Sequence, residues 1–280
     1  MRFFTLCLTY AQMLESGLLA GLAKLGGVLY LGISLSAYLL QDKLIFQQRP
    51  LTEARHSEIV ARHTNVSDIF LQAADGTRLH AWHFKSDAGA PLVIYFGGNA
   101  EEVSWMIEQL AYRRTKTAWL LVDYRGYGAS GGAPSEEALS SDALAWYDFV
   151  ARDAKRVYAF GRSLGSGVAV RMAAERRLDG IILVTPYDSM TAVARYHYPL
   201  LPVSLLLRHR FDSLSLAPKL SIPLLCMAAT DDHVVPLDHA RRLYDAWAGP
   251  KRWLPLAGGH NDTDDQPEYW PAIEAFLAGH

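Results

Sequence analysis

Cysteine is scarce in this chain, and its positive and negative charges nearly cancel. Only Cys7 and Cys226 occur in 280 residues, which excludes a disulfide framework and leaves no spacing typical of a metal site. We interpret Cys226, which lies in a predicted core strand, as a small buried apolar residue. The 27 basic and 29 acidic residues include no basic run interleaved with aromatics, so nothing indicates a nucleic-acid partner. The chain also lacks repeats, low-complexity tracts and an interdomain linker, and its apolar half is enough for one large core.

A long apolar segment lies near the N-terminus. Residues 17–40 contain one charge, Lys24, and as a helix they are long enough to cross a hydrocarbon layer of about 30 Å. We interpret residues 1–45 as a single-pass membrane anchor and residues 46–280 as the folded domain. For a bacterial protein this would be the inner membrane. The basic residues on the two sides of the segment lean only slightly toward a cytoplasmic domain, so the side stays open.

Two other interpretations of this segment remain. A signal peptide, cleaved or uncleaved, is disfavoured because the apolar stretch exceeds the usual length of roughly 7 to 15 residues, and because no Ala-x-Ala site follows it. A soluble helix packed on the domain is disfavoured because four glycines, Gly21, Gly26, Gly27 and Gly32, are poor helix formers in water.

The rest of the chain alternates between apolar runs and helical patterns. Residues 66–73 and 78–84 flank Asp75-Gly76 and predict a hairpin. We predict further strands at 92–96, 118–122, 157–160, 181–184, 224–228 and 252–256. We predict helices at 103–113, 136–151, 163–175 and 238–248, and at the C-terminus. This α/β alternation indicates a mostly parallel sheet with helices on both faces. Residues 47–62 read as a polar connector, and the proline-rich, apolar residues 186–218 predict a small lid over the sheet edge.

The main chemical motif is GRSLGSG, residues 161–167, between a predicted strand and a predicted helix. A G-x-S-x-G sequence in that context is typical of a sharp turn that exposes a nucleophilic serine, here Ser163. The alternative is a structural turn in which Ser163 only caps the helix that follows.

A serine hydroxyl needs a base, and the base needs an acid to orient it. His260 follows the last predicted strand in the loop AGGHND; the only other histidine beyond that strand is the terminal His280. In the fold that carries this turn the acid lies between serine and histidine. AATDDHVVP offers Asp231 and Asp232, of which we favour Asp232 because the acid usually lies three residues before a Val-Pro pair. Asp188 is a weaker third candidate.

An oxyanion hole takes two backbone N–H groups, one from the residue after the nucleophile, Leu164, and one from the loop after the third strand. In YFGGNAEE we choose Asn99 for the second. Asn99 could instead, or in addition, cap a helix beginning near Ala100.

The sequence resembles the single-pass, membrane-anchored α/β-hydrolase-domain proteins, a group that resembles serine aminopeptidase-like hydrolases and includes protein depalmitoylases. The matching stretches cover nearly all of the chain after about residue 40: QDKLIFQ, YFGGNAEE, VDYRGYGASGGAPSEE, GRSLGSG, FDSLSLAPKLSIPLL, TDDHVVP and GGHND. The resemblance implies the α/β-hydrolase fold, a triad of Ser163, Asp232 and His260, and oxyanion donors at Asn99 and Leu164. One departure is Gly97, where the family commonly has histidine.

We therefore predict a serine hydrolase that cleaves carboxylic esters or thioesters through an acyl-enzyme, without a metal or an organic cofactor. The apolar lid and the membrane helix favour a fatty-acyl or lipid-like substrate. A serine peptidase or amidase with the same triad is one alternative, and a catalytically inactive membrane-tethered scaffold is another. The sequence does not predict an oligomeric state.

Overall fold

The predicted strands form one eight-stranded sheet in the computed structural model, which describes residues 2–87, 89–152 and 154–279. The strand order is β1-β2-β4-β3-β5-β6-β7-β8. The strands are β1 (Val66–Gln72), β2 (Arg78–Phe84), β3 (Leu92–Phe96), β4 (Ala118–Asp123), β5 (Val157–Arg162), β6 (Gly180–Val184), β7 (Leu224–Ala229) and β8 (Lys251–Leu256). β1 and β2 pair as the predicted hairpin, β2 pairs antiparallel with β4, and the remaining pairs are parallel. The predicted α/β-hydrolase architecture is confirmed.

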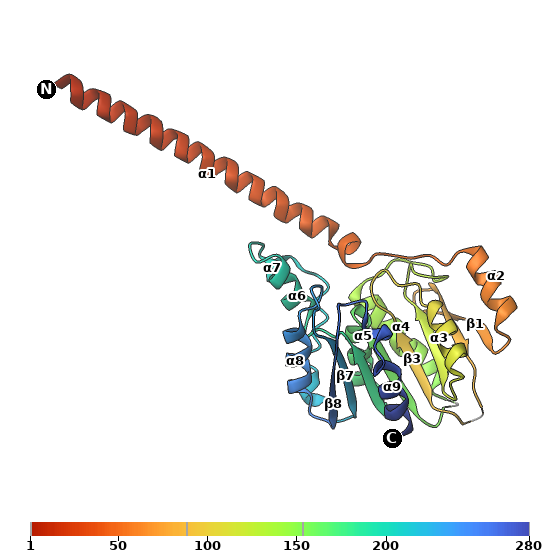
Figure 1. Ribbon diagram of the computed structural model, residues 1–280. Helices are drawn as coiled ribbons and strands as arrows, with labels where there is room; N and C mark the ends of the chain where they lie inside the picture. The colour runs from red at the N-terminus through yellow and green to blue at the C-terminus, as the bar shows by residue number, and fades with distance from the viewer. Residues whose placement is uncertain (1, 88, 153, 280) are drawn as a thin grey trace.

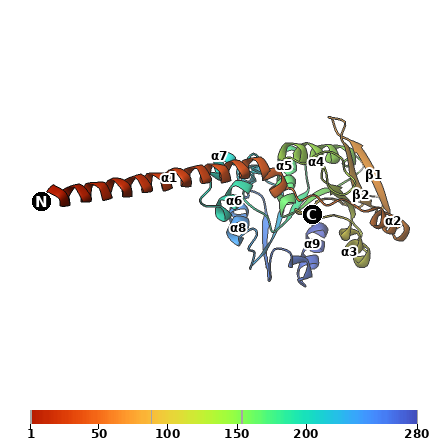
Figure 2. The same ribbon diagram turned by 90° about the horizontal axis from the view of Figure 1, so that it is seen from above.

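Helices cover both faces of this sheet. One face carries α4 (Glu136–Val150), α5 (Leu164–Glu175) and α8 (Leu237–Ala246), and the other carries α3 (Trp105–Arg113) and α9 (Tyr269–Ala278). Figure 2 shows α4 and α5 on the side of the sheet opposite α3 and α9. The inner strands are therefore buried on both faces, and all five residues of β3, LVIYF, are buried, which explains their uninterrupted apolar sequences.

The strand order reverses at the centre of the sheet. β3 has β4 on one side and β5 on the other, and the chain leaves β3 toward α3 on one face but leaves β5 toward α5 on the other. Diverging loops open a crevice at the carboxyl ends of such strands. The segments that carry Asn99 and Ser163 both begin there.

The predicted lid, residues 186–218, lies between β6 and β7. It contains α6 (Met190–His197) and α7 (Val203–Leu206), and the one-turn helix η1 (Ala217–Lys219) closes it. In this segment α7 follows Pro202, and the apolar side chains of Leu200 and Leu205 are exposed. In Figure 1 α6 and α7 lie on the side of the domain from which the first helix departs.

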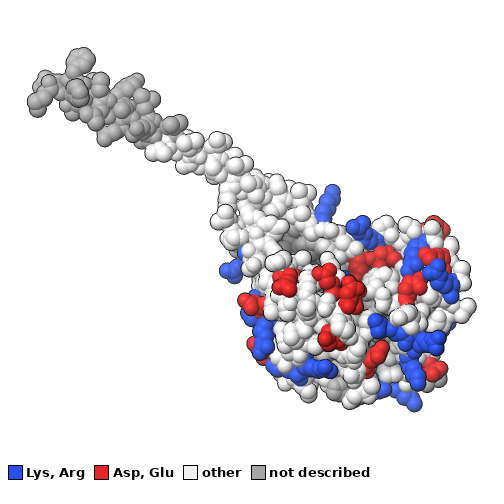
Figure 3. Space-filling model, in the orientation of Figure 1, with Lys and Arg blue, Asp and Glu red and all other residues white. Residues whose placement is uncertain are grey.

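That first helix, α1 (Arg2–Ile45), projects away from the domain (Figure 1). Within it, Leu19–Ile45 is long and apolar enough to cross a membrane, judged by length and composition, and little of it is buried. Figure 3 shows charged side chains scattered over the domain, whereas no charged side chain is visible on this face of the described part of α1 that projects from it.

Two local predictions are wrong. The presumed connector at residues 47–62 contains a helix, α2 (Glu53–Arg62), capped by Thr52 and anchored by the buried Ile59. No helix begins near Ala100, because Ala100 has a φ of 58° and α3 starts only at Trp105.

Candidate active site

Ser163 occupies a strained turn between β5 and α5. Its φ of 49° and ψ of −115° are unusual for a residue with a side chain, and such a conformation costs on the order of 1 to 3 kcal/mol. The two glycines of the motif allow the turn: a Cβ at Gly161 would lie 2.4 Å from the Gly165 carbonyl oxygen, and one at Gly165 would lie 2.0 Å from that of Phe96. Strand, turn and helix therefore pack too closely for any other residue at these two positions.

The structure brings Ser163, His260 and Asp232 into one chain of hydrogen bonds. His260 Nε2 lies 2.8 Å from Ser163 Oγ, and His260 Nδ1 lies 2.7 Å from Asp232 Oδ2. Because the carboxylate can only accept, Nδ1 carries the proton and Nε2 accepts from the serine hydroxyl. Both His260 and Asp232 are buried, so little water competes for these bonds.

Asp232 is itself held by the backbone of its own loop. Its second oxygen, Oδ1, accepts hydrogen bonds from the N–H groups of Val234 at 2.9 Å and Val235 at 2.7 Å. These two donors fix the orientation of the carboxylate toward His260.

The competing acids lie elsewhere. Asp231 is exposed, with Thr230 as a side-chain partner. Asp188 accepts from His239 and Arg242 of α8 at 2.7 Å each. Burial disfavours the charge of Asp188, yet these hydrogen bonds outweigh it and lower its pKa. Asp188 thus ties the lid base to α8, and His280 lies outside the described residues.

Leu164 and Asn99 lie beside Ser163 at the crevice. Leu164 is the first residue of α5, where backbone N–H groups have no acceptor within the helix. Among the described residues the Asn99 N–H likewise has no hydrogen-bond acceptor. The Asn99 side chain accepts from the Gln47 N–H at 2.8 Å and the Tyr127 hydroxyl at 3.0 Å, so the loop is fixed while its N–H stays free.

A glutamate whose side chain is only 7% exposed lies beside Gly97, the position where the family commonly has histidine. Glu101 accepts from the Gly98 N–H at 2.6 Å, the Tyr95 hydroxyl at 2.5 Å and the Trp105 indole at 2.8 Å. Burial and the charge of Glu101 raise the pKa of Tyr95, which keeps its hydroxyl a donor. A side chain at Gly97 would lie within 3.0 Å of Glu101, so the glutamate occupies that space.

Arg162 connects this glutamate to the histidine loop. Its guanidinium donates to Glu101 Oε2 and to Asn261 Oδ1, each at 3.0 Å. Three loops, those of Asn99, Ser163 and His260, are therefore joined by one ion pair and its hydrogen bonds. We did not predict this network, although Glu101 stands within the YFGGNAEE stretch.

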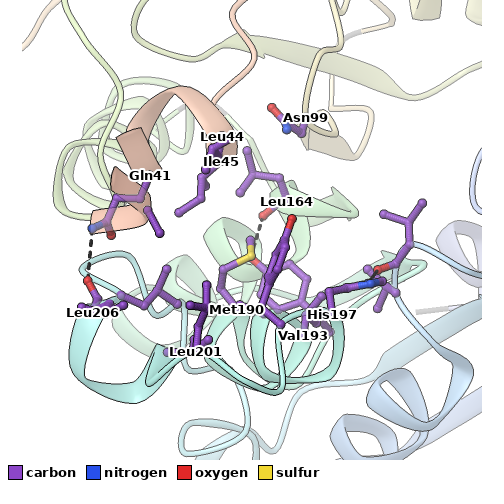
Figure 4. Close-up of a pocket in the computed structure, with 18 of the residues that line it drawn as sticks. Gln41, Leu44, Ile45, Asn99, Leu164, Met190, Val193, His197, Leu201 and Leu206 are labelled. Atoms are coloured by element: carbon purple, nitrogen blue, oxygen red, sulfur yellow. Dashed lines mark hydrogen bonds between the residues drawn. The ribbon is translucent and has the colours of Figure 1, made fainter. Parts of the chain in front are cut away.

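An apolar cavity of about 330 Å³ opens at Ser163. Among the described residues that line it, none is Asp, Glu, Lys or Arg. Its walls come from the lid and, unexpectedly, from α1; Figure 4 shows Gln41, Leu44 and Ile45 of α1 facing Met190, Val193 and Leu201 of the lid. No group of three or more His, Cys, Asp or Glu placed to hold a metal ion occurs in the described part of the chain.

Comparison with known proteins agrees with this architecture. A family model described as serine hydrolase matches residues 139–279. The membrane protein YNL320W of Saccharomyces cerevisiae is 30% identical over 255 residues, covering 86% of this chain and 89% of the yeast protein. The lysophosphatidylserine lipase ABHD12 of Danio rerio is 31% identical over 205 residues, covering 61% of this chain and 51% of the lipase. The solved acetyl xylan esterase from Paenibacillus sp. R4 has a TM-score of 0.64 at 21% identity, covering 78% of this chain and 85% of the esterase. The chain belongs to the serine hydrolases of the α/β-hydrolase superfamily.

Proposed function

We propose that this protein is a membrane-attached hydrolase that cleaves carboxylic ester or thioester bonds of fatty-acyl substrates, with Ser163 as nucleophile. One observation carries the proposal. Ser163, which is hydrogen-bonded through His260 to Asp232, lies at an apolar cavity without charged lining residues. A nucleophile at the mouth of such a cavity suits a substrate whose acyl chain fills it and whose leaving group stays outside.

In the first half of the reaction Ser163 Oγ attacks the acyl carbonyl carbon while His260 Nε2 takes the hydroxyl proton. The carbonyl oxygen becomes negatively charged and is stabilised by the N–H groups of Leu164 and Asn99. The bond to the leaving alkoxide or thiolate then breaks, and His260 returns the proton to the leaving group. Asp232 stabilises the imidazolium in between, and an acyl-Ser163 ester remains.

In the second half a water molecule repeats these steps. His260 removes a proton from water, the hydroxide attacks the acyl carbon, and the same N–H pair holds the oxyanion. The collapse of this intermediate releases the carboxylic acid, and His260 returns the proton to Ser163 Oγ. These steps use only side-chain and backbone groups of the chain.

Membrane attachment through α1 and an acyl substrate support each other. Most large apolar side chains between Lys24 and Asp42 are exposed, and hydrocarbon is the environment that suits such a surface. The names of two relatives are consistent with both parts of this proposal, since one is named as a membrane protein and another as a lysophosphatidylserine lipase. The solved neighbour is named as an esterase.

The test uses the full chain with a fluorophosphonate probe and p-nitrophenyl esters of graded acyl length, alongside acyl thioesters and p-nitroanilides. We expect labelling of the wild type, its loss in Ser163→Ala, and a kcat/KM that rises with acyl length until the cavity is full. Each buried methylene contributes up to about 0.8 kcal/mol, or about fourfold. Absence of labelling in folded wild type would refute the enzyme, and faster p-nitroanilide cleavage would favour an amidase.

A further inference from the structure

The lid and α1 meet through polar contacts inside an otherwise apolar region. The Gln41 side chain, 5% exposed, donates to the Leu206 carbonyl at 3.1 Å and accepts from the Arg208 N–H at 2.7 Å. Asp42 accepts from Arg208 at 2.7 Å and from His209 at 2.8 Å. These bonds fasten the end of the lid to the last turns of α1.

A further contact lies much closer to the N-terminus of α1. The Tyr30 hydroxyl donates to the Leu200 carbonyl at 3.0 Å. Tyr30 precedes Asp42 by roughly 18 Å of helix, at 1.5 Å per residue. The tip of the lid therefore runs back along α1, away from the domain.

The charged residues of α1 mark the part of the helix that could lie in the hydrocarbon layer of a membrane. Lys24 and Asp42 enclose an uncharged stretch of α1, and they lie roughly 27 Å apart along the helix, close to the thickness of a hydrocarbon core. Tyr30 lies well inside this stretch, and the lid residue that it contacts, Leu200, lies beside the helix at the same level. If the stretch occupies the bilayer, the tip of the lid occupies it as well.

The outer surface of the lid suits that environment. Leu200 and Leu205 are each 84% exposed, and Tyr196 and Tyr198 beside them are also exposed. Leucines with neighbouring tyrosines are typical of segments that enter the boundary of a bilayer. Arg195 and Arg210 of the lid are exposed, and cationic side chains next to an inserted segment can reach lipid headgroups.

We propose that the lid enters the lipid leaflet beside α1, so that the acyl substrate passes directly from the bilayer into the cavity at Ser163. The cavity lies between the two inserted elements, since Ala37, Gln41 and Leu44 of α1 form one wall and Leu201 and Leu206 of the lid form another. The acyl chain then stays in an apolar environment throughout. This inference rests on the proposed function and on membrane attachment through α1.

The first experiment measures depth. The full chain carrying Cys7→Ser is reconstituted in vesicles of phosphatidylcholine and phosphatidylglycerol, and a bimane label is attached at Leu200→Cys. Cys226 is buried and burial raises its pKa, so it stays unlabelled. The matched control is Tyr112→Cys on α3, also 84% exposed but at the opposite edge of the sheet.

We expect lipids with a doxyl group within the acyl chain to quench the Leu200 label at least about threefold more than the Tyr112 label. Equal quenching of the two labels would overturn the inference. This measurement needs no charged variant and stays decisive even where such a variant folds poorly.

The second experiment separates the inference from the proposed function. Leu200→Asp with Leu205→Asp should reduce hydrolysis of a long-chain ester embedded in vesicles by more than about tenfold, because aspartate opposes insertion. Neither leucine lines the cavity, so hydrolysis of soluble p-nitrophenyl acetate should be unchanged. Unchanged hydrolysis in vesicles would overturn lid insertion. Retained acetate hydrolysis in Ser163→Ala would instead overturn the proposed function.

Discussion

Replacing Asp232 by asparagine changes one atom, and the surrounding hydrogen bonds decide how the new amide is oriented. The Val234 and Val235 N–H groups both point at Oδ1, so the oxygen of the new amide must take that place. Its NH₂ group then faces His260 Nδ1, where Asp232 Oδ2 now lies at 2.7 Å. In the reversed orientation the NH₂ group would face the two backbone N–H donors and could not accept from them.

An NH₂ group opposite Nδ1 forces that nitrogen to accept. The imidazole proton moves to Nε2, and Nε2 can no longer take the proton of Ser163, 2.8 Å away. A triad with this misplaced proton loses about 10⁴-fold in kcat, which corresponds to a barrier higher by about 5.5 kcal/mol. The imidazolium also loses its counter-charge.

Asp231→Asn is the matched control, because it is the same substitution one residue earlier on an exposed side chain. Its kcat/KM should stay within about twofold of wild type, since a change at an exposed side chain has little effect on the folded state. The assay is steady-state hydrolysis of p-nitrophenyl butyrate, with the Tm of each variant as a check on folding. A loss at Asp231→Asn of more than about 10³-fold, with Asp232→Asn near wild type, would refute the assignment.

Three further predictions concern the frame around the site. Gly165→Ala should destabilise the domain by about 3 kcal/mol or more in chemical denaturation, because its Cβ would meet the Phe96 carbonyl oxygen at 2.0 Å. Glu101→Gln should lower kcat about tenfold with a smaller change in KM, because it loosens the oxyanion loop. Asp188→Asn should lower Tm at pH 7, and the difference from wild type should shrink as pH falls through the lowered pKa of Asp188. The lowered pKa of Asp188 stabilises the fold above about pH 3.9, and this contribution disappears as pH falls through the folded pKa.

Each of these has a control or a contrary outcome. Gly131→Ala should be tolerated, because its Cβ would find its nearest neighbour at 3.6 Å. If the Tm of Glu101→Gln fell close to the assay temperature, unfolding would account for the lower kcat, which would indicate general loosening instead of positioning. A Tm difference for Asp188→Asn that does not shrink as the solution is acidified would show that the ionisation of Asp188 is not the cause.

The sheet was predictable because its inner strands are buried on both faces and read as continuous apolar runs, as residues 92–96 do. The helix at Glu53–Arg62 was not, because it is short and polar and buries only Ile59. The alternative role of Asn99 as a helix cap is wrong, because Ala100 has a positive φ and α3 begins only at Trp105.

The positions of Ser163 and His260 could be predicted because each follows a strand, and the carboxyl ends of parallel strands share one edge of the sheet. The ion pair of Glu101 with Arg162 could not, because its members are 61 residues apart and such pairings leave no periodic pattern. The Asn261 contact is 99 residues from Arg162. Local patterns predict the candidate catalytic residues, whereas the residues that hold their loops together appear only in three dimensions.

The end of α1 is where a sequence-based division of the chain is least adequate. A boundary at residue 45 separates an anchor from a domain, yet Ala37, Gln41 and Leu44 line the cavity at Ser163. A plain anchor has no reason to bury a polar side chain, because an unpaired buried amide costs free energy. Gln41 is buried and paired at both ends of its amide, with Leu206 and Arg208. The apolar helix thus holds the lid, and under the proposed function the segment that anchors the protein also completes the substrate pocket.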